Sequence, residues 1–226
     1  MKLRFVSAGA AHSIVTALAA ARSIDVEGSF GAVGAMRDKF LAGEACDIVI
    51  LTGAQIAELA AANRVLGDTA ADMGRVATSI AVRAGEMPPQ VADAASLAAA
   101  LCACDAIYFP DPAKATAGIH FAAVLGKLGI GEEVAARLRT FPNGATAMRE
   151  LARSAGRAIG CTQATEILAT PGVTLVAPLP GGLDLETVYA AAVTSASTQR
   201  DAARHFVGLL TGEGSRGQRA AAGFRI

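Results

Sequence analysis

The stretch KLRFVSAGAAHS, residues 2–13, decides the fold, because it changes from a strand pattern to a helix start within one short loop. Polar and apolar residues alternate over 2–6, as they do in a half-buried β-strand. Small residues then lead into segment 13–22, where apolar side chains recur with a period near 3.6. A strand followed at once by a helix is the building unit of an α/β fold.

The same alternation continues along the chain. Further strands are predicted at 47–51, 80–82, 106–109, 158–161, 174–176 and 188–193, and further helices at 36–42, 54–62, 92–103, 118–128, 132–138, 145–155, 163–169 and 198–210. Several of these strands are continuously apolar, as expected when helices cover both faces of a parallel sheet. The sequence therefore predicts an α/β protein with largely parallel sheets.

Composition excludes several classes of function. Twenty basic and twenty acidic side chains among 226 residues give a formal net charge of zero, whereas a nucleic-acid binder needs a basic surplus. There is no Trp, only two Tyr and eight Phe, and hence no stacking platform for bases or sugars. No apolar run approaches the roughly 20 residues of a membrane-spanning helix. We expect neither nucleic acid nor membrane insertion.

Metal and cofactor motifs are also missing from the sequence. The four cysteines lack Cys-x-x-Cys spacing and are interpreted as small buried hydrophobic residues: Cys46, Cys102, Cys104 and Cys161. The three histidines show no i, i+4 pair, and no phosphate-binding glycine loop occurs. We therefore expect no metal and no cofactor.

A strand around 78–85 ends in RAGEMPP (83–89), and residues 178–184 read PLPGGLD. The Pro and Gly content of both stretches is typical of turns or linkers and divides the chain into three parts. If the first and last parts fold together, two lobes joined by two crossings result. Periodicity by itself leaves this pairing open. The predicted first strand begins almost at Met1, which leaves no room for a signal peptide. We expect a periplasmic location if such a peptide has been removed, and otherwise a cytoplasmic one.

Several stretches resemble, in order, type II periplasmic solute-binding proteins, in the branch that includes molybdate-binding proteins. They are FVSAGA (5–10), GSFG (28–31), GAM (34–36), LAGEACDIVI (41–50), AVRAG (81–85), YFPDPA (108–113), AGIH (117–120), GCTQ (160–163), LTGEG (210–214) and AGF (222–224). The resemblance implies two α/β lobes, 1–80 plus 184–226 and 81–183, with hinge crossings near 78–85 and 178–186. It also implies a ligand cleft between the lobes and an ABC-transporter permease as partner.

Members of this family hold anions with backbone N–H groups at helix N-termini and with short hydroxyl side chains, which need no titratable cation. The resemblance places the matching loops at 7–13, 31–34, 116–118 and 143–146. The ligand-binding residues that it implies are Ser7, Gly9, His12, Ser13, Gly34, Thr116, Gly118, His120, Asn143 and Gln163.

The sequence departs from the molybdate pattern at three places. The serine expected before the first helix is Ala10, the serine cluster after the second strand reads GAVG (31–34), and the tyrosine after a late strand is Gln163. Each lost donor to a buried charged ligand costs about 1.5–3 kcal/mol. A small carboxylate or another tetrahedral oxyanion is therefore expected in place of molybdate.

The pattern also resembles aconitate isomerase, an enzyme on the same scaffold, which offers a second hypothesis. Isomerisation of an unsaturated polycarboxylate needs an acid and a base, and the resemblance points to His12, His120 and Lys114. Each has a structural alternative: an exposed helix residue for His12, a packing role for His120 and a solvated loop for Lys114. Ser13 and Gln163 can equally cap helices, and Asp111 is expected to shape a turn.

Overall fold

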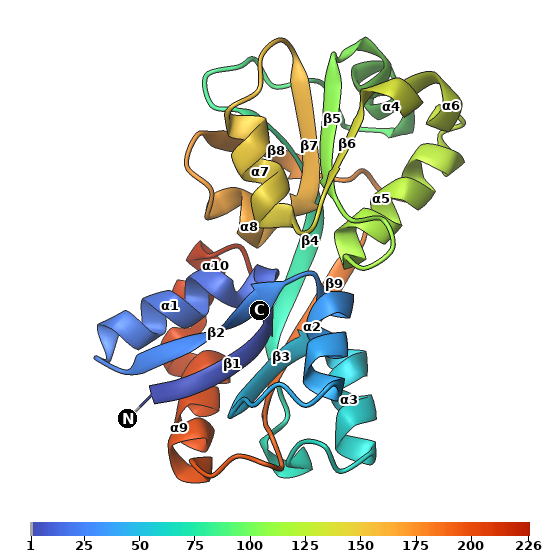
Figure 1. Cartoon of the computed structure of the whole chain (residues 1–226). Helices are drawn as coiled ribbons and strands as arrows, with labels where there is room; N and C mark the ends of the chain where they lie inside the picture. Colours follow the sequence, from blue (N-terminus) through green and yellow to red (C-terminus); the bar gives the residue numbers. More distant parts are fainter. Residues whose placement is uncertain (1) are drawn as a thin grey trace. The chain divides into compact units, whose positions relative to one another are not determined.

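The computed structural model describes residues 2–226, which form two compact units (Figure 1). Unit 1 comprises the described residues up to Val76 together with Thr187–Ile226, and unit 2 comprises Ala77–Glu186. Two strands, β4 (Ala71–Arg83) and β9 (Glu186–Val193), carry the chain from one unit to the other.

Unit 1 has a sheet in the order β2-β1-β3-β9. Its other elements are β1 (Lys2–Ala8), the 3-10 helix η1 (Gly9–Ala11), α1 (His12–Ala21), β2 (Asp25–Gly31), α2 (Val33–Leu41), β3 (Ile48–Thr52), α3 (Gly53–Ala61), η2 (Gly67–Thr69), α9 (Arg200–Thr211), η4 (Glu213–Ser215) and α10 (Arg216–Ala221). β1 pairs in parallel with β2 and β3, and β9 is antiparallel to β3.

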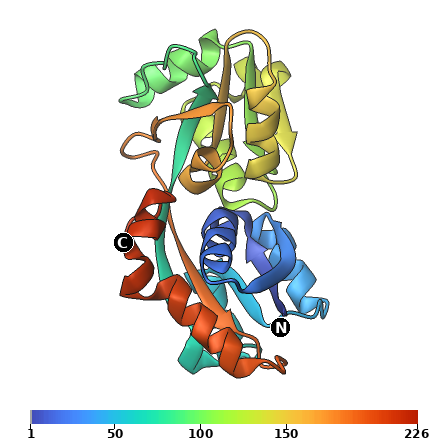
Figure 2. The same cartoon turned by 90° about the vertical axis from the view of Figure 1, so that its left-hand side faces the viewer.

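The core of unit 1 lies on both faces of this sheet. Helices α1 and α9 lie on one side and α2 and α3 on the other (Figures 1 and 2). Phe5 of β1 meets Phe206 of α9 edge to face, with ring centroids 5.4 Å apart, and both side chains are fully buried. Aromatic pairs in this geometry add about 0.5–1.5 kcal/mol beyond the area that they bury.

Unit 2 has a second sheet, in which β4 pairs with β8 and with β7, and β5 lies between β7 and β6. Its elements are α4 (Ala94–Ala103), β5 (Ala106–Pro110), α5 (Thr116–Lys127), α6 (Gly131–Val134), η3 (Ala135–Arg137), β6 (Leu138–Phe141), α7 (Gly144–Ala152), β7 (Ala158–Gln163), α8 (Ala164–Leu168) and β8 (Val173–Pro178). β5 is parallel to both of its neighbours, and β4 is antiparallel to both of its own.

Two separate apolar clusters cover the faces of the unit 2 sheet. One contains Leu97 of α4 and Phe121 of α5, and the other contains Met148 of α7 and Ile167 of α8 (Figure 1). The alternation along β7 explains the division, since neighbouring side chains of a strand point to opposite faces. The predicted α/β class, with sheets flanked by helices, is confirmed, and the sheets are mixed because β4, β8 and β9 form antiparallel pairs.

The sequence pattern missed two strands, β2 and β6, because both are edge strands with few buried side chains. Of the seven residues in β2 only Gly31 is buried, and β6 has none. A helix was predicted to continue to Leu138, but that residue begins β6. Gly28 of β2 packs so closely on β1 that a Cβ atom there would lie 2.3 Å from the Phe5 carbonyl oxygen.

Candidate functional site

In unit 1 three parallel strands end at one edge of the sheet, and each is followed directly by a helix. β1 leads into α1 through η1, β2 leads into α2, and β3 leads into α3. Ala8 at the end of β1 lies beside Gly31 at the end of β2, so the starts of α1 and α2 are neighbours. The strand–helix pattern of the sequence thus brings two helix N-termini together at this edge.

The starts of α1 and α2 differ from that of α3 in their capping. The first N–H groups of a helix have no acceptor within the helix. At α3, Thr52 Oγ1 accepts from the Gln55 N–H at 3.3 Å, and Gln55 Oε1 accepts from the Thr52 N–H at 3.4 Å. The corresponding residues before α1 and α2 are Ala11 and Ala32, which supply no side-chain acceptor. Neither start therefore has a side-chain cap, and the His12 N–H at the start of α1 donates to the Gly9 carbonyl oxygen of η1.

Five of the predicted ligand contacts lie at this edge of unit 1: Ser7, Gly9, His12, Ser13 and Gly34. The Ser7 side chain is buried, and its hydroxyl donates to the Ala8 carbonyl oxygen at 3.0 Å. His12 is exposed at the first position of α1, and its ring packs on Phe30 of β2 with ring centroids 4.5 Å apart. Phe30 therefore restrains the orientation of the imidazole.

Unit 2 repeats this arrangement with β5, β6 and β7, which are followed by α5, α7 and α8. The three strands are parallel, and Pro110 at the end of β5 lies beside Phe141 at the end of β6. The three helices therefore start at one edge of the unit 2 sheet. The predicted contacts of this unit lie there or one turn beyond: Thr116, Gly118, His120, Asn143 and Gln163.

The start of α5 has no side-chain cap, because Ala115 precedes it. The loop before it is shaped by Asp111, whose Oδ1 accepts from the Ala113 N–H at 2.7 Å and from the Lys114 N–H at 3.2 Å. The expected turn role of Asp111 is confirmed. A Cβ atom at Gly118 would lie 2.3 Å from the Asp111 carbonyl oxygen, so glycine is required for the helix to pack on its own loop.

The start of α7 is filled by protein groups. Asn143 Oδ1 accepts from the Thr146 N–H at 2.8 Å. The carboxylate of Glu166, which comes from α8, lies against Gly144, and the backbone N–H groups of Ala145, Gln163 and Gly144 lower its pKa. The first turn of α7 is therefore occupied by groups of unit 2, the Asn143 side chain and the Glu166 carboxylate.

Glu166 is a buried carboxyl group that forms no ion pair with any described residue. Its Oε2 accepts from the Thr162 hydroxyl at 2.6 Å. Burial raises the pKa of Glu166, while the Thr162 hydroxyl and the backbone N–H groups oppose this rise. The sequence reasoning overlooked this residue, because a glutamate near a helix start is typical of an exposed helix position.

The predicted acid and base residues of unit 2 have different surroundings. The Nε2 atom of His120 lies 2.7 Å from the Leu183 carbonyl oxygen, and the ring is half-buried. Since a carbonyl oxygen can only accept, Nε2 carries the proton in this contact and Nδ1 is the basic nitrogen of the neutral ring. Lys114 is exposed in the loop before α5.

Two buried hydroxyl groups near Gln163 were also missed by the sequence reasoning. Thr78 of β4 lies directly opposite Gln163 of β7, and Thr165 follows two residues later in α8. All three side chains are buried, and the Thr78 and Thr165 hydroxyls have no hydrogen-bond partner among the described residues. Such hydroxyls can donate to a bound molecule, but a single Thr within a strand gives no signal in the sequence.

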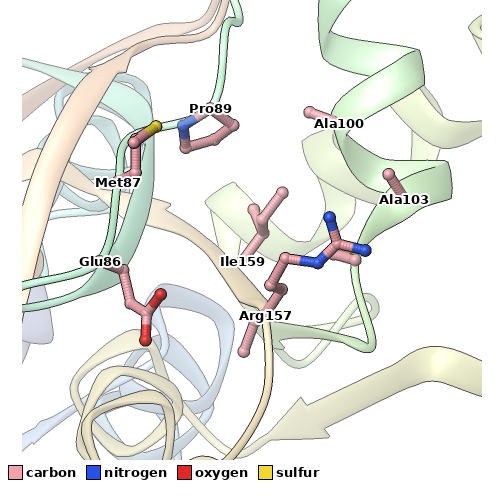
Figure 3. Close-up of a pocket in the computed structure, with 9 residues that line it drawn as sticks. Glu86, Met87, Pro89, Ala100, Ala103, Arg157 and Ile159 are labelled. Carbon is pink, nitrogen blue, oxygen red and sulfur yellow. The ribbon is translucent and has the colours of Figure 1, made fainter.

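A cavity of about 190 Å³ lies elsewhere in unit 2, at the opposite end of β7 (Figure 3). Met87 and Pro89 flank it on one side and Ala100 and Ala103 of α4 on the other, with Ile159 between them. Glu86, Cys104, Arg157 and Ala158 complete its lining. Ala158 and Ile159 begin β7, whereas α8 follows its other end. This mainly apolar cavity is therefore separate from the helix starts.

The cysteines are unsuited to nucleophilic chemistry. Burial raises the pKa of all four thiols, that of Cys46 to about 12, so the thiol form predominates at neutral pH. Cys46, Cys104 and Cys161 are buried as predicted, and Cys102 is only partly so. Within residues 2–226, no cluster of His, Cys, Asp and Glu could hold a metal ion, and no helix is long and apolar enough to cross a membrane.

Comparison with known proteins extends over almost the whole chain. The family model described as bacterial extracellular solute-binding protein matches residues 3–225. An aconitate isomerase from Pseudomonas sp is 25% identical over 180 residues, which are 78% of this chain and 66% of that protein. The match thus spans just under two thirds of the relative's length.

Solved structures share the fold at lower sequence identity. The periplasmic molybdate-binding protein of Azotobacter vinelandii has a TM-score of 0.78 at 17% identity, with 99% of each chain covered. The sulfate-binding protein SubI of Mycobacterium tuberculosis has a TM-score of 0.71 at 20% identity, covering 100% of this chain and 86% of that one. These likenesses confirm the fold.

Proposed function

This chain belongs to the family of bacterial extracellular solute-binding proteins, and on that premise we propose that it binds a small anion for an ABC-transporter permease. The ligand class proposed is a carboxylate or a tetrahedral oxyanion. The proposed location is outside the cytoplasmic membrane, where the family's solutes are captured. Molybdate-binding and sulfate-binding proteins with this fold are consistent with an anionic solute.

The observation that carries the proposal is the lack of side-chain caps at the starts of α1, α2 and α5. Natural helices commonly satisfy these donors with Ser, Thr, Asp or Asn, as α3 and α7 do here. Helix starts carry a partial positive charge, so uncapped ones at the end of a sheet favour an anion. Each hydrogen bond to a charged group contributes about 1.5–3 kcal/mol.

The proposed contacts combine backbone donors with a few side chains. They are Ser7, Gly9, His12, Ser13, Gly34, Thr116, Gly118, His120 and Gln163. Asn143 is a weaker candidate, because its side-chain oxygen already accepts from Thr146. Neutral donors of this kind need no surplus of Lys and Arg, which agrees with the net charge of zero.

Molybdate is not the proposed ligand. Ala10 and Ala32 stand at loop positions where hydroxyl donors are expected for it, and neither alanine can donate from its side chain. Gln163 offers an amide in place of a phenol. A planar carboxylate needs fewer donors around it than a tetrahedral dianion, so the set of backbone N–H groups suits it better.

A ligand panel tests this proposal by thermal shift and calorimetry. The panel contains molybdate, sulfate, phosphate, citrate, cis-aconitate and trans-aconitate, each against sodium chloride of equal ionic strength. A ligand that binds only the folded protein raises Tm in proportion to its concentration over Kd. We expect a saturable rise for at least one carboxylate, and molybdate to be weaker. No shift with any member would overturn the proposal.

A second candidate function is isomerisation of an unsaturated polycarboxylate. Two observations support it. One is the similarity to an aconitate isomerase. The other is the Leu183 contact of His120, which leaves Nδ1 as a base in the neutral ring. In this hypothesis a base removes an allylic proton, N–H donors stabilise the delocalised anion, and an acid returns a proton after rotation.

The enzyme hypothesis has its own assay. Protein is incubated with cis-aconitate, and the trans isomer is followed by proton NMR, with solvent deuterium exchange as a second readout. His120→Gln, His12→Gln and Lys114→Met remove the candidate acid and base groups singly. We expect a loss of 10²-fold or more at a residue that transfers a proton. Binding of cis-aconitate without turnover by the wild type would leave transport as the function.

A further inference from the structure

Glu166 occupies a position where a bound anion would sit. Its carboxylate lies against Gly144 at the start of α7, a helix of nine residues, and the backbone N–H groups of Ala145, Gln163 and Gly144 lower its pKa. The Thr162 hydroxyl donates to the same group, with Oε2 and Oγ1 2.6 Å apart. Backbone N–H groups of a helix start together with a hydroxyl are the donors expected around a bound oxyanion.

The backbone at this position is shaped around the carboxylate. A Cβ atom at Gly144 would lie 1.9 Å from Glu166 Oε2 and 2.0 Å from Thr162 Oγ1. No side chain larger than hydrogen fits there while Glu166 is in place. Together with Asn143, which accepts from the Thr146 N–H, the carboxylate occupies the start of α7.

The charge of Glu166 is balanced by dipoles and not by a cation. None of the described ion pairs includes Glu166, and only 8% of this residue is exposed. The cation carried by α7 is Arg149, whose Nη2 donates to Thr146 Oγ1 at 2.9 Å and not to the carboxylate. The Thr162 hydroxyl and then the backbone N–H groups around the α7 start therefore compensate the buried carboxylate.

We propose that Glu166 is an internal anion that fills the α7 start and so withholds this helix end from the solute. Glu166 is then a positioning residue that limits which helix start of unit 2 can bind an anion. With the α7 start filled, α5 is the long helix whose start can take an anionic group. This consequence rests on the proposed function, whereas the occupancy of α7 can be tested without any solute.

The test is chemical rescue of Glu166→Ala with formate or acetate, measured by Tm at pH 7. The variant vacates the carboxylate position, so we expect Tm to fall by roughly 5 °C or more. Formate should then raise Tm saturably and recover at least half of the loss, with chloride at equal ionic strength as reference. Glu150→Ala, which removes a partly exposed carboxylate from α7, is the matched control.

Two outcomes would overturn the inference. One is an equal formate response in the wild type, Glu150→Ala and Glu166→Ala. The other is a full formate response in Glu166→Gln, whose amide still fills the position and should block rescue. If Glu166→Ala is unfolded without formate, the same titration measures whether formate restores the folded protein. Failure to restore it counts against the inference.

The failure of this inference and that of the proposed function are distinguishable. Formate rescue of Glu166→Ala, with no response of the wild type to the anion panel, would leave the internal anion standing and refute anion transport. A wild-type response to the anion panel without formate rescue of Glu166→Ala would refute the internal anion and leave the proposed anion binding standing.

Discussion

The starts of α5 and α7 lie at the same edge of one sheet, yet one is open and the other is closed. Before α5 stands Ala115, which has no acceptor, whereas α7 has Asn143 and the carboxylate of Glu166. Both helices follow parallel strands and both begin with small residues. The comparison teaches that two helices at equivalent positions of one α/β sheet can differ in whether protein groups fill their starts.

The largest expected effect comes from Gly144→Ala, because the new methyl group would collide with Glu166 Oε2 at 1.9 Å. We expect the free energy of unfolding to fall by about 3 kcal/mol, the upper range for overpacking. Urea denaturation measures it. Gly126→Ala in α5 is the control, since nothing lies within 4 Å of its Cβ position and alanine favours helix there by up to about 1 kcal/mol.

A cap introduced at α5 should make it resemble α7. Ala115 has the extended backbone of an N-cap, with φ −97° and ψ 128°, so the hydroxyl of Ala115→Ser can accept from the first turn. We expect the Kd of the anion found in the panel to rise roughly tenfold, equivalent to about 1.4 kcal/mol, by calorimetry. Thr52→Ala, which removes the α3 cap, should weaken folding and leave Kd unchanged. An unaltered Kd in Ala115→Ser would mean that α5 holds no anion.

Removal of the α7 cap should affect folding more than binding. Asn143→Ala deprives the Thr146 N–H of its acceptor, and such losses cost about 1 kcal/mol. Urea denaturation should show this decrease in stability. The Kd of the anion should change less than about twofold, because changes at independent sites act separately. A tenfold rise in Kd would instead place Asn143 at the ligand and contradict a closed α7.

The smallest effect is a pH dependence that comes from the buried carboxyl group of Glu166 at the start of α7. Burial raises the folded-state pKa of Glu166 above the value of 4.5 that it has in an unfolded chain. Its contribution to stability is therefore fully present below pH 4.5 and is lost as pH rises through the folded-state pKa. The stability of Glu166→Gln relative to wild type should improve over this range in urea titrations. A pH-independent difference would contradict the raised pKa.

Much of the fold could be predicted from the periodicity of the sequence, but the strands with few buried residues could not. The buried runs that became β3, β5 and β7 were predicted because continuous apolar segments are conspicuous. The edge strands β2 and β6 escaped, since their mainly solvent-facing side chains carry no such pattern. Sheet pairing was equally invisible: β4, β8 and β9 are antiparallel to their partners, which depends on contacts between distant segments.

The candidate site divides in the same way. The loops before α1, α2, α5 and α7 were found because small residues link a strand to a helix there. The hydroxyls of Thr78 and Thr165 and the carboxylate of Glu166 were not, since burial of an isolated polar residue depends on its neighbours in space. Ligand roles for His12, Lys114 and His120 stay predictions.

The sequence by itself determined the alternation of strands and helices, the neutral charge balance and the presence of small residues at helix starts, because these are local properties of the chain. Only the tertiary structure decided which of those starts are filled. Glu166 reaches Gly144 from 22 positions further along the chain, a difference between the two residue numbers that no local pattern connects. The packing of α8 beside α7 puts the Glu166 carboxylate against the start of α7.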